Sequence, residues 1–156
     1  MSTVVDYVGR TVDVVAYQGS GFGGERQLTQ SLGRAEDGRG MIITGIVKLG
    51  QRFILELLTE QGSMQFLPTR GCTFMTEARL GYFRNQVDVL AALSRALIGI
   101  KRNLKSEESN SDPDDERYGS VVVDSIEYVA GEVKLFLSLT SRAGAVTVVL
   151  PISVSI

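Results

Sequence analysis

The chain has 156 residues, 44% hydrophobic and 22% charged, which is typical of one globular domain with its own core. Its net charge of -2 argues against general binding to nucleic acid or to anionic membranes, because such binding depends on clustered positive charge. The absence of histidine excludes Ser-His-Asp and Cys-His catalysis and the usual His-containing zinc sites.

We expect a soluble protein that is made in a cytoplasm. No apolar run approaches the ~20 residues that a membrane-spanning helix needs. The first residues, Met1–Asp6, lack the basic region, apolar core and small-residue cleavage site of a secretory signal. The single cysteine, Cys72, excludes an internal disulfide and fits a reducing compartment.

Residues 1–40 are predicted to form one strand and a flexible segment. Val8–Tyr17 is rich in valine and alternates loosely, which favours a strand. Gln18–Gly24 is typical of a glycine-rich turn or mobile loop. Glu25–Leu32 fits a short strand or a short helix equally well. Gly33–Gly40 holds four charges and three glycines and is expected to be exposed.

Two amphipathic helices are predicted next. Met41–Leu58 is the clearer one, with apolar residues at helical spacing on one side: Ile42, Ile46, Leu49, Phe53 and Leu57. Asn85–Leu104 is the second, with Asn85 as its N-cap and Asp88 in its first turn. Its expected buried stripe consists of Val87, Leu90, Ala91, Leu97, Ile98 and Leu104.

The segment Ser106–Gly119 is rich in aspartate and glutamate and contains Pro113. We interpret it as a solvated acidic loop. A calcium-binding loop is the alternative, but the central glycine and fixed oxygen spacing of that motif are absent.

The C-terminal region predicts an antiparallel β-meander. Val121–Val129 and Glu132–Thr140 are separated by a turn, and a third alternating segment follows with Val146, Val148, Leu150, Ile152 and Val154 on one face. The predicted fold class is therefore α+β: two amphipathic helices packed on a small, mostly antiparallel sheet that ends in a C-terminal β-meander. Residues 41–156 are expected to form this domain.

Three candidate sites have ordinary structural explanations. Gly19–Gly24 matches the dinucleotide-binding glycine pattern, but no clear helix or second parallel strand follows, so we interpret it as a loop. Glu56 and Glu60 lie one turn apart and form a possible glycosidase pair, although solvated helix charges are the commoner explanation, with Arg52 in reach of Glu56. Cys72 is expected to be a buried structural thiol.

The last segment, Leu150–Ile156, is predicted to be an apolar edge strand, because Pro151 lacks an amide donor and proline is confined to edges or strand ends. One interpretation is a strand that packs only against its own sheet. The other is an edge to which a partner adds a strand. The sequence does not decide between them.

The order of these pieces resembles the sheath-initiator, or baseplate-wedge, family of contractile phage tails, which has a counterpart in type VI secretion baseplates. The resemblance covers roughly residues 41–156. It begins with Ile54–Thr59 and continues through an amphipathic helix with Val87, Leu90 and Leu97 to the terminal β-hairpin. The motif residues are Leu57, Leu58, Thr59, Gly62, Pro68, Arg70 and Gly71.

The chain departs from the family at one point of the motif. Many members carry an acidic residue and an arginine directly after the glycine, whereas Ser63 and Met64 stand here. Arg70 is a candidate replacement for that charged pair, and the sequence leaves this open. Some members have carried a lysozyme-like label. No acid–base pair in this chain supports that activity, and a small carboxylate-dependent glycoside hydrolase is kept only as the alternative.

The resemblance implies a non-enzymatic virion protein of the tail baseplate, without cofactor or metal. Several copies would surround the tail axis and contact the tail sheath protein, other baseplate wedge proteins and the tail tube, with no nucleic acid or membrane partner. The C-terminal strands would imitate the strand exchange of sheath subunits and template the first sheath ring. The implied partner-binding residues are Val146, Val148, Leu150, Pro151, Ile152, Val154 and Ile156.

Overall fold

The computed structural model describes residues 13–14, 17–18, 29–30, 42–129, 132–144 and 147–155. The elements are β1 (Asp13–Val14), β2 (Tyr17–Gln18), β3 (Thr29–Gln30), β4 (Ile42–Ile43), α1 (Gly45–Leu58), α2 (Phe74–Arg79), α3 (Gln86–Glu107), β5 (Tyr118–Val129), β6 (Glu132–Ser141) and β7 (Thr147–Ser155). The fold is α+β, as predicted.

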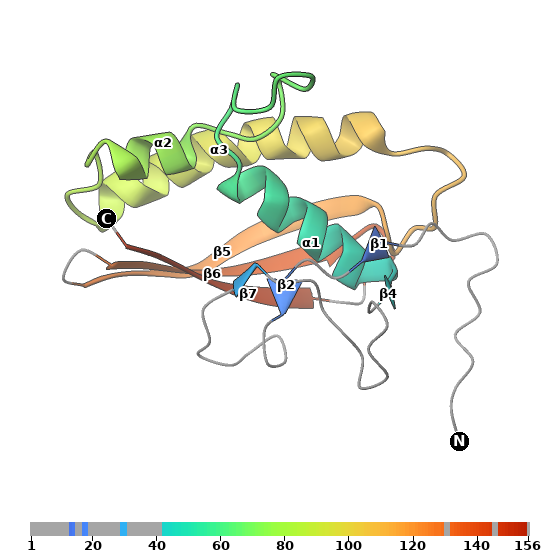
Figure 1. The fold of residues 1–156 in the computed structure, drawn as a ribbon. Coiled ribbons are helices and arrows are strands. Elements are labelled where there is room, and N and C mark those ends of the chain that lie inside the picture. The colour runs from blue at the N-terminus through green and yellow to red at the C-terminus, as the bar shows by residue number, and fades with distance from the viewer. Residues whose placement is uncertain are drawn as a thin grey trace.

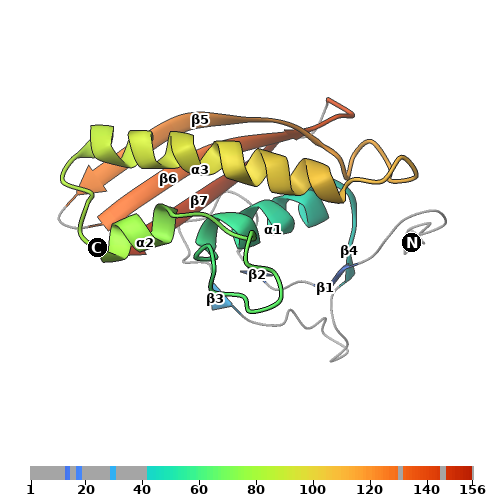
Figure 2. The ribbon, with the colours of Figure 1, turned by 90° about the horizontal axis from the view of Figure 1, so that it is seen from above.

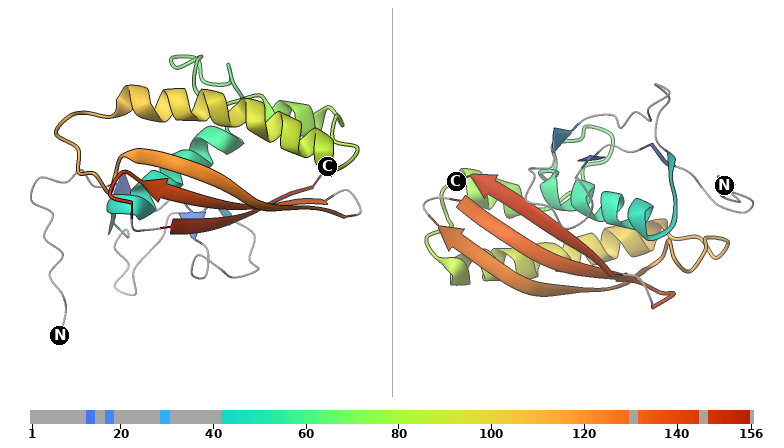
Figure 3. Two further views of the ribbon diagram at one scale, coloured as in Figure 1. Left: turned by 180° about the vertical axis from the view of Figure 1, so that it is seen from behind. Right: turned by 90° about the horizontal axis from the view of Figure 1, so that it is seen from below.

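A three-stranded antiparallel sheet, ordered β5-β6-β7, forms one layer of the molecule. Helices α1 and α3 form the other layer on a single face of this sheet (Figure 1). Seen from below, the three strands lie in front of the helices (Figure 3). The predicted β-meander is confirmed, and its middle strand carries the apolar alternation that faces the helices.

The core lies between the helices and the sheet. Its largest fully buried side chains come from α1, α3 and β6, together with Phe74 of α2. They are Leu49, Phe53, Ile54, Leu57, Phe74, Leu93, Ile100, Leu104, Leu135, Leu137 and Leu139. Phe74 also contacts Phe83, with ring centroids 5.1 Å apart, which fixes α2 against the start of α3.

Helix α1 begins at Gly45 and not at Met41, because Ile42 and Ile43 form β4 and pair with β1. The backbone N–H of Gly45 donates to Oε1 of Glu116 at 3.2 Å, and Nζ of Lys48 donates to Oε2 of the same carboxylate at 3.2 Å. A carboxylate at a helix N-terminus is favoured by the helix dipole. Glu116 is therefore a buried cap for α1 and not part of a solvated loop.

The segment that precedes β5 is ordered by further contacts, so the prediction of a solvated loop over Ser106–Gly119 is wrong in part. Its first two residues belong to α3 and its last two to β5. Glu108 accepts a hydrogen bond from the backbone N–H of Tyr118 at 2.6 Å. Within the described residues, no group of three or more Cys, Asp or Glu side chains is placed to hold a metal ion.

Helix α3 has the predicted N-cap, because Asn85 Oδ1 accepts from the N–H groups of Val87 at 2.8 Å and Asp88 at 3.0 Å. The predicted buried stripe, however, is wrong in phase. Val87, Leu90, Ala91 and Ile98 are exposed, Leu97 is half-buried, and only Leu104 is buried. The buried side of α3 consists of Val89, Ala92, Leu93, Ala96, Ile100, Asn103 and Leu104.

The N-terminal predictions are covered only in part. The predicted strand Val8–Tyr17 contains β1 and the first residue of β2, which pair with different partners, β4 and β3. Of Glu25–Leu32, the two described residues form β3, which favours the strand alternative there. Gly19–Gly24 and Gly33–Gly40 lie outside the described residues.

Candidate functional site

The first candidate site is the outer edge of β7. This strand pairs with β6 without interruption from Thr147 opposite Thr140 to Ser155 opposite Glu132. Among the described residues no strand pairs with its other side. Five of the predicted partner-binding residues lie in this strand: Val148, Leu150, Pro151, Ile152 and Val154. Val146 and Ile156 lie outside the described residues.

The register agrees with the predicted alternation. Positions 148, 150, 152 and 154 pair with Leu139, Leu137, Leu135 and Val133, which are the buried apolar residues of β6. Pro151 pairs with Phe136, and the register continues unchanged on both sides of it. A proline within a regular ladder is typical of an edge strand.

The two edges of the sheet differ in how open they are to a further strand. Strand β5 contains two register shifts, at Tyr118/Ser120 and at Val123/Ser125, and carries Asp124 and Glu127. Bulges and charges of this kind discourage edge-to-edge pairing. Strand β7 has no register shift and no charged residue, and its sequence is TVVLPISVS. Of the two edges, β7 is therefore the one suited to strand addition.

The second candidate site is the loop after α1, which contains most of the family-motif residues. Its ends are joined by backbone hydrogen bonds, from Cys72 N to Thr59 O at 2.9 Å and from Gln61 N to Cys72 O at 3.1 Å. Between these ends the chain is almost entirely exposed. Such a closed surface excursion is an Ω-loop, and we call residues 61–71 the anchored loop.

Two glycines of the motif are required by the backbone. Gly71 has φ +79°, and a Cβ atom there would lie 2.3 Å from the carbonyl oxygen of Thr59. Gly62 has φ +83° in the turn after α1, with open space around it. Only glycine adopts this left-handed region without strain. Glycines at positions 62 and 71 thus allow the chain to turn after α1 and to return to Thr59, which closes the loop.

A buried carboxylate holds the closing end of the anchored loop. Glu56 is 7% exposed, and both of its oxygens accept hydrogen bonds. Oε1 accepts from Arg70 Nη1 at 2.5 Å, and Oε2 accepts from Gly71 N at 3.0 Å and Asn103 Nδ2 at 2.8 Å. Asn103 Nδ2 also donates to the carbonyl of Thr69 at 3.1 Å. The loop is therefore tied to both α1 and α3.

Arg70 faces inward, because it also pairs with Glu107 at the end of α3. Glu107 in turn pairs with Arg52 at 2.6 Å. The predicted pairing of Arg52 with Glu56 is thus replaced by a network in which Arg70 sits between two glutamates. Because its guanidinium is committed to this network, Arg70 does not supply a charge at the tip of the loop near Ser63 and Met64.

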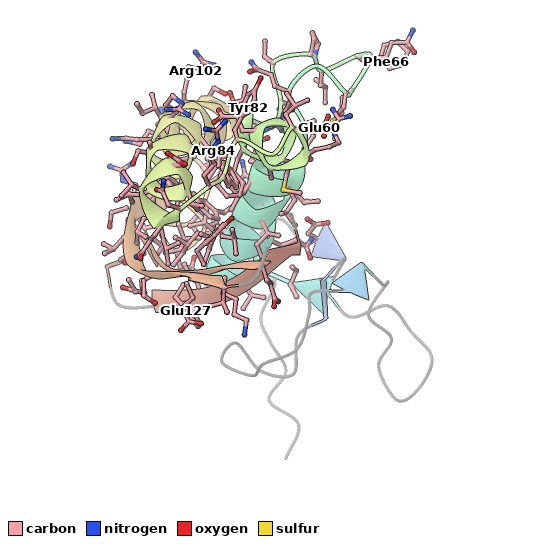
Figure 4. All side chains as sticks on the ribbon, turned by 90° about the vertical axis from the view of Figure 1, so that its left-hand side faces the viewer. Glu60, Phe66, Tyr82, Arg84, Arg102 and Glu127 are labelled. Atoms are coloured by element: carbon pink, nitrogen blue, oxygen red, sulfur yellow. The ribbon has the colours of Figure 1, made fainter. Side chains whose placement is uncertain are left out.

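The tip of the anchored loop is apolar and exposed. Phe66 is 89% exposed and projects from the loop, away from the helices and the sheet (Figure 4). Met64 and Leu67 beside it are also exposed. The loop extends beyond the helices on the side away from the sheet, whereas β7 lies in the sheet (Figure 1). The two candidate sites are therefore separate.

The contacts of the two candidate catalytic carboxylates favour a structural role. Both oxygens of Glu56 accept hydrogen bonds from protein donors that hold the loop. Glu60 forms an exposed ion pair with Arg79 at 3.1 Å. Cys72 is buried, as predicted, and its thiol donates to Leu57 O at 3.3 Å. Burial raises the pKa of this thiol to about 11.

The remaining motif residues support the loop. Leu57 is a core residue, Leu58 is half-buried against the core, Thr59 is the C-cap of α1, and Pro68 is exposed in the loop. Sequence reasoning missed Asn103, although its position at helical spacing from Ala96 and Ile100 marks it as a polar residue on a buried face.

Comparison of the chain with protein-family models, with curated protein sequences and with solved structures gave no match. In the described part of the chain, no helix is long and apolar enough to cross a bilayer. The function proposed next therefore rests on the motif, the sheet edge and the anchored loop.

Proposed function

We propose that this chain is a non-enzymatic structural component of the baseplate of a contractile phage tail. In this role it anchors the first ring of sheath subunits and templates it through its C-terminal strands. It acts in the virion, in several copies around the tail axis, with the tail sheath protein, other wedge proteins and the tail tube as partners.

The single observation that carries the proposal is the uncharged, regularly paired edge of β7. A sheath strand that adds to this edge gains main-chain hydrogen bonds along its length, and alternate side chains set its register. The other edge of the sheet is blunted by bulges and acidic residues. One copy of the chain thus accepts one strand at one defined place, which is what a template requires.

The backing of the sheet fits the same role. Helices α1 and α3 pack on one face, and α1 contacts both β6 and β7. Because the four buried apolar residues of β6 are fully covered, the edge strand is held on a well-packed layer. A rigid edge loses little conformational entropy when a partner strand is added.

The test is sheath assembly seeded by the purified chain. Removing Leu150–Ile156 would delete most of β7 and could unfold the sheet, so a point substitution tests the edge more directly. In Val149→Lys, the new charge lies on β7 at a position that pairs with the uncharged Ser138. Lysine on an edge strand opposes strand addition.

The matched control is Val122→Lys, because Val122 is exposed on β5 and pairs with the same Ser138 from the other side. Each protein is mixed with the tail sheath protein from the same genome, and sheath polymers are scored by negative-stain microscopy and sedimentation. We expect the wild type and the β5 variant to seed sheath, and the β7 variant to stay folded but inactive. Normal seeding by the β7 variant, or no binding of sheath by the wild type, would overturn the proposal.

A further inference from the structure

The outer side of α3 carries an apolar stripe that no described residue covers. Val87 is 72% exposed, Leu90 45% and Ile98 74%, and Ala91 is exposed between them. These positions lie on one side of the helix over about 16 Å of its axis, with exposed Ser94 and Arg95 at the turn between Ala91 and Ile98. Figure 2 looks down on α3, and no described element crosses it along its length.

This stripe is distinct from the core-facing side of the same helix. Val89, Leu93 and Ile100 face α1 and the sheet and are fully buried. The helix therefore has two apolar sides, and only one of them is used within the described fold. A single exposed leucine needs no explanation, whereas an aligned row on a regular helix is typical of a surface that binds another helix.

The same outer side becomes basic towards the C-terminal end of α3. Lys101, Arg102 and Lys105 are exposed, and none of them forms an ion pair with any described residue. Arg102 points away from the sheet, on the side of the molecule opposite Glu127 (Figure 4).

Most other cations around the helices are paired; Arg84, which is exposed just before the first turn of α3, is an exception. Lys48, Arg52, Arg70, Arg79 and Arg95 each pair with a glutamate. In a chain of net charge -2, the cluster at the end of α3 thus remains without a neutralising acid within the described fold.

We propose that the outer side of α3, from Val87 to Lys105, is the docking surface for an acidic amphipathic helix of a partner protein. The apolar stripe receives the partner's apolar side chains, and the basic group receives its carboxylates. The partner helix runs antiparallel to α3, because acidic residues concentrate in the first turns of helices and would then lie against Lys101, Arg102 and Lys105. Antiparallel packing also sets the two helix dipoles in opposite directions.

A protein helix fits this surface better than an anionic membrane does. The unpaired cations of α3 lie at one end of the apolar stripe, and Arg95 beside the stripe is paired with Glu77. Helices that lie in a bilayer interface instead carry a broad apolar face with flanking lysines and arginines. The net negative charge of the chain also opposes approach to anionic lipid.

The experiment uses the full chain and a synthetic helical peptide. The peptide carries glutamates in roughly its first two turns and leucines at i, i+3, i+4 and i+7 spacing after them. A second peptide has lysine in place of every glutamate. Binding is followed by backbone amide NMR shifts and by fluorescence anisotropy, and no sheath or baseplate protein is present, so the result is independent of the proposed function.

We expect the acidic peptide to bind with a dissociation constant of roughly 10–100 µM and to shift the amides of α3. Leu90→Ser with Ile98→Ser, and separately Lys101→Glu with Arg102→Glu, should each weaken binding by at least about tenfold. The matched control, Val122→Ser with Val129→Ser, removes exposed apolar side chains from β5 and should leave binding unchanged. All substituted residues are exposed, and circular dichroism verifies folding.

Equal binding of the acidic and basic peptides would overturn the proposal, as would no binding up to about 1 mM. Two further measurements separate other occupants. Concentration-dependent dimers in sedimentation that Leu90→Ser with Ile98→Ser abolishes would make a second copy the occupant. Binding to phosphatidylserine vesicles that the same variant loses would assign the surface to a membrane. Either result would overturn the assignment to an acidic helix.

Discussion

Replacing Glu56 by glutamine tests whether the buried carboxylate anchors the loop. Three donors converge on Glu56: Arg70 Nη1, Gly71 N and Asn103 Nδ2. Glutamine has the same shape but only one acceptor oxygen. If that oxygen faces Arg70, the amide NH₂ meets the donors of Gly71 and Asn103. If the side chain is turned over, the NH₂ meets the guanidinium of Arg70.

The second orientation retains more hydrogen bonds, and its cost can be estimated. It loses one charge-assisted hydrogen bond of about 1.5–3 kcal/mol and places the glutamine NH₂ against the guanidinium of Arg70, so that two donors face each other. Removing one partner of a buried ion pair costs about 3–5 kcal/mol, but Arg70 is partly exposed and keeps Glu107. We therefore expect Glu56→Gln to reduce the free energy of unfolding by about 2–3 kcal/mol. For a chain of this size, that lowers the melting temperature by roughly 4–12 °C.

The control for this experiment is Glu60→Gln, which removes the other candidate catalytic carboxylate. Its ion pair with Arg79 is exposed, so the expected loss is below about 1 kcal/mol. Urea unfolding measures both variants, and hydrogen exchange at the Gly71 and Cys72 amides reports whether the loop opens locally. A loss for Glu56→Gln no larger than that for Glu60→Gln, with unchanged exchange, would refute the anchoring role.

Backbone geometry and burial support three further predictions. Gly71→Ala should reduce the free energy of unfolding by about 2–4 kcal/mol, because its Cβ would collide with the carbonyl of Thr59. Gly62→Ala should reduce it by only about 1 kcal/mol, because the space around Gly62 is open, and denaturant titration distinguishes the two variants. Asn85→Ala removes the N-cap of α3 and should cost about 1 kcal/mol by the same measurement. The Cys72 thiol should resist a disulfide reagent near pH 8 until the protein unfolds, and because burial raises its pKa from 9.0 to about 11, stability should fall as pH rises between those values.

The parts of the fold that were predictable from sequence have strong periodicity. The sequences of β6 and β7 alternate with period two, and α1 repeats apolar residues at helical spacing over four turns. The α+β class follows from these elements alone. The short helix α2, Phe74–Arg79, was not predicted, because six residues hold too few turns for a period to appear. It forms because Phe74 is buried against Phe83.

The phase of α3 was not predictable, because the helix carries two apolar stripes. Large residues favoured the side with Val87, Leu90 and Ile98, yet that side is exposed. The side that packs contains Ala92 and Ala96, whose small side chains permit close approach to neighbouring elements. It also contains Asn103, a polar residue that is expected to be exposed but is buried because its side chain donates a hydrogen bond to Glu56.

The two candidate sites were predictable to different degrees, because one rests on a local sequence pattern and the other on contacts between distant residues. The β7 edge follows from local alternation and one proline, both visible in the sequence. The hydrogen-bond network of Glu56 with Arg70, Gly71 and Asn103, which we call the hub, joins α1, the anchored loop and α3. Arg70 and Asn103 are separated from Glu56 by 14 and 47 positions along the chain. No local pattern encodes such a contact. The motif glycines indicated where the loop lies in the sequence, but the residues that bond to Glu56 could be identified only from the three-dimensional structure.

The composition of the hub bears on function, because a loop can be fixed to a core without buried charge. A well-packed apolar cluster of similar volume often stabilises a fold as well as a buried ion pair does, since ions lose their hydration on burial. The carboxylate adds directional hydrogen bonds: Glu56 accepts from Arg70 and Gly71 of the loop and from Asn103 of α3 at once, which restricts the geometry of the loop. A free surface loop gains nothing from that restriction. The adaptor that we propose would gain from it, because each copy around the tail axis would then present Phe66 and its neighbours in the same orientation relative to the sheet.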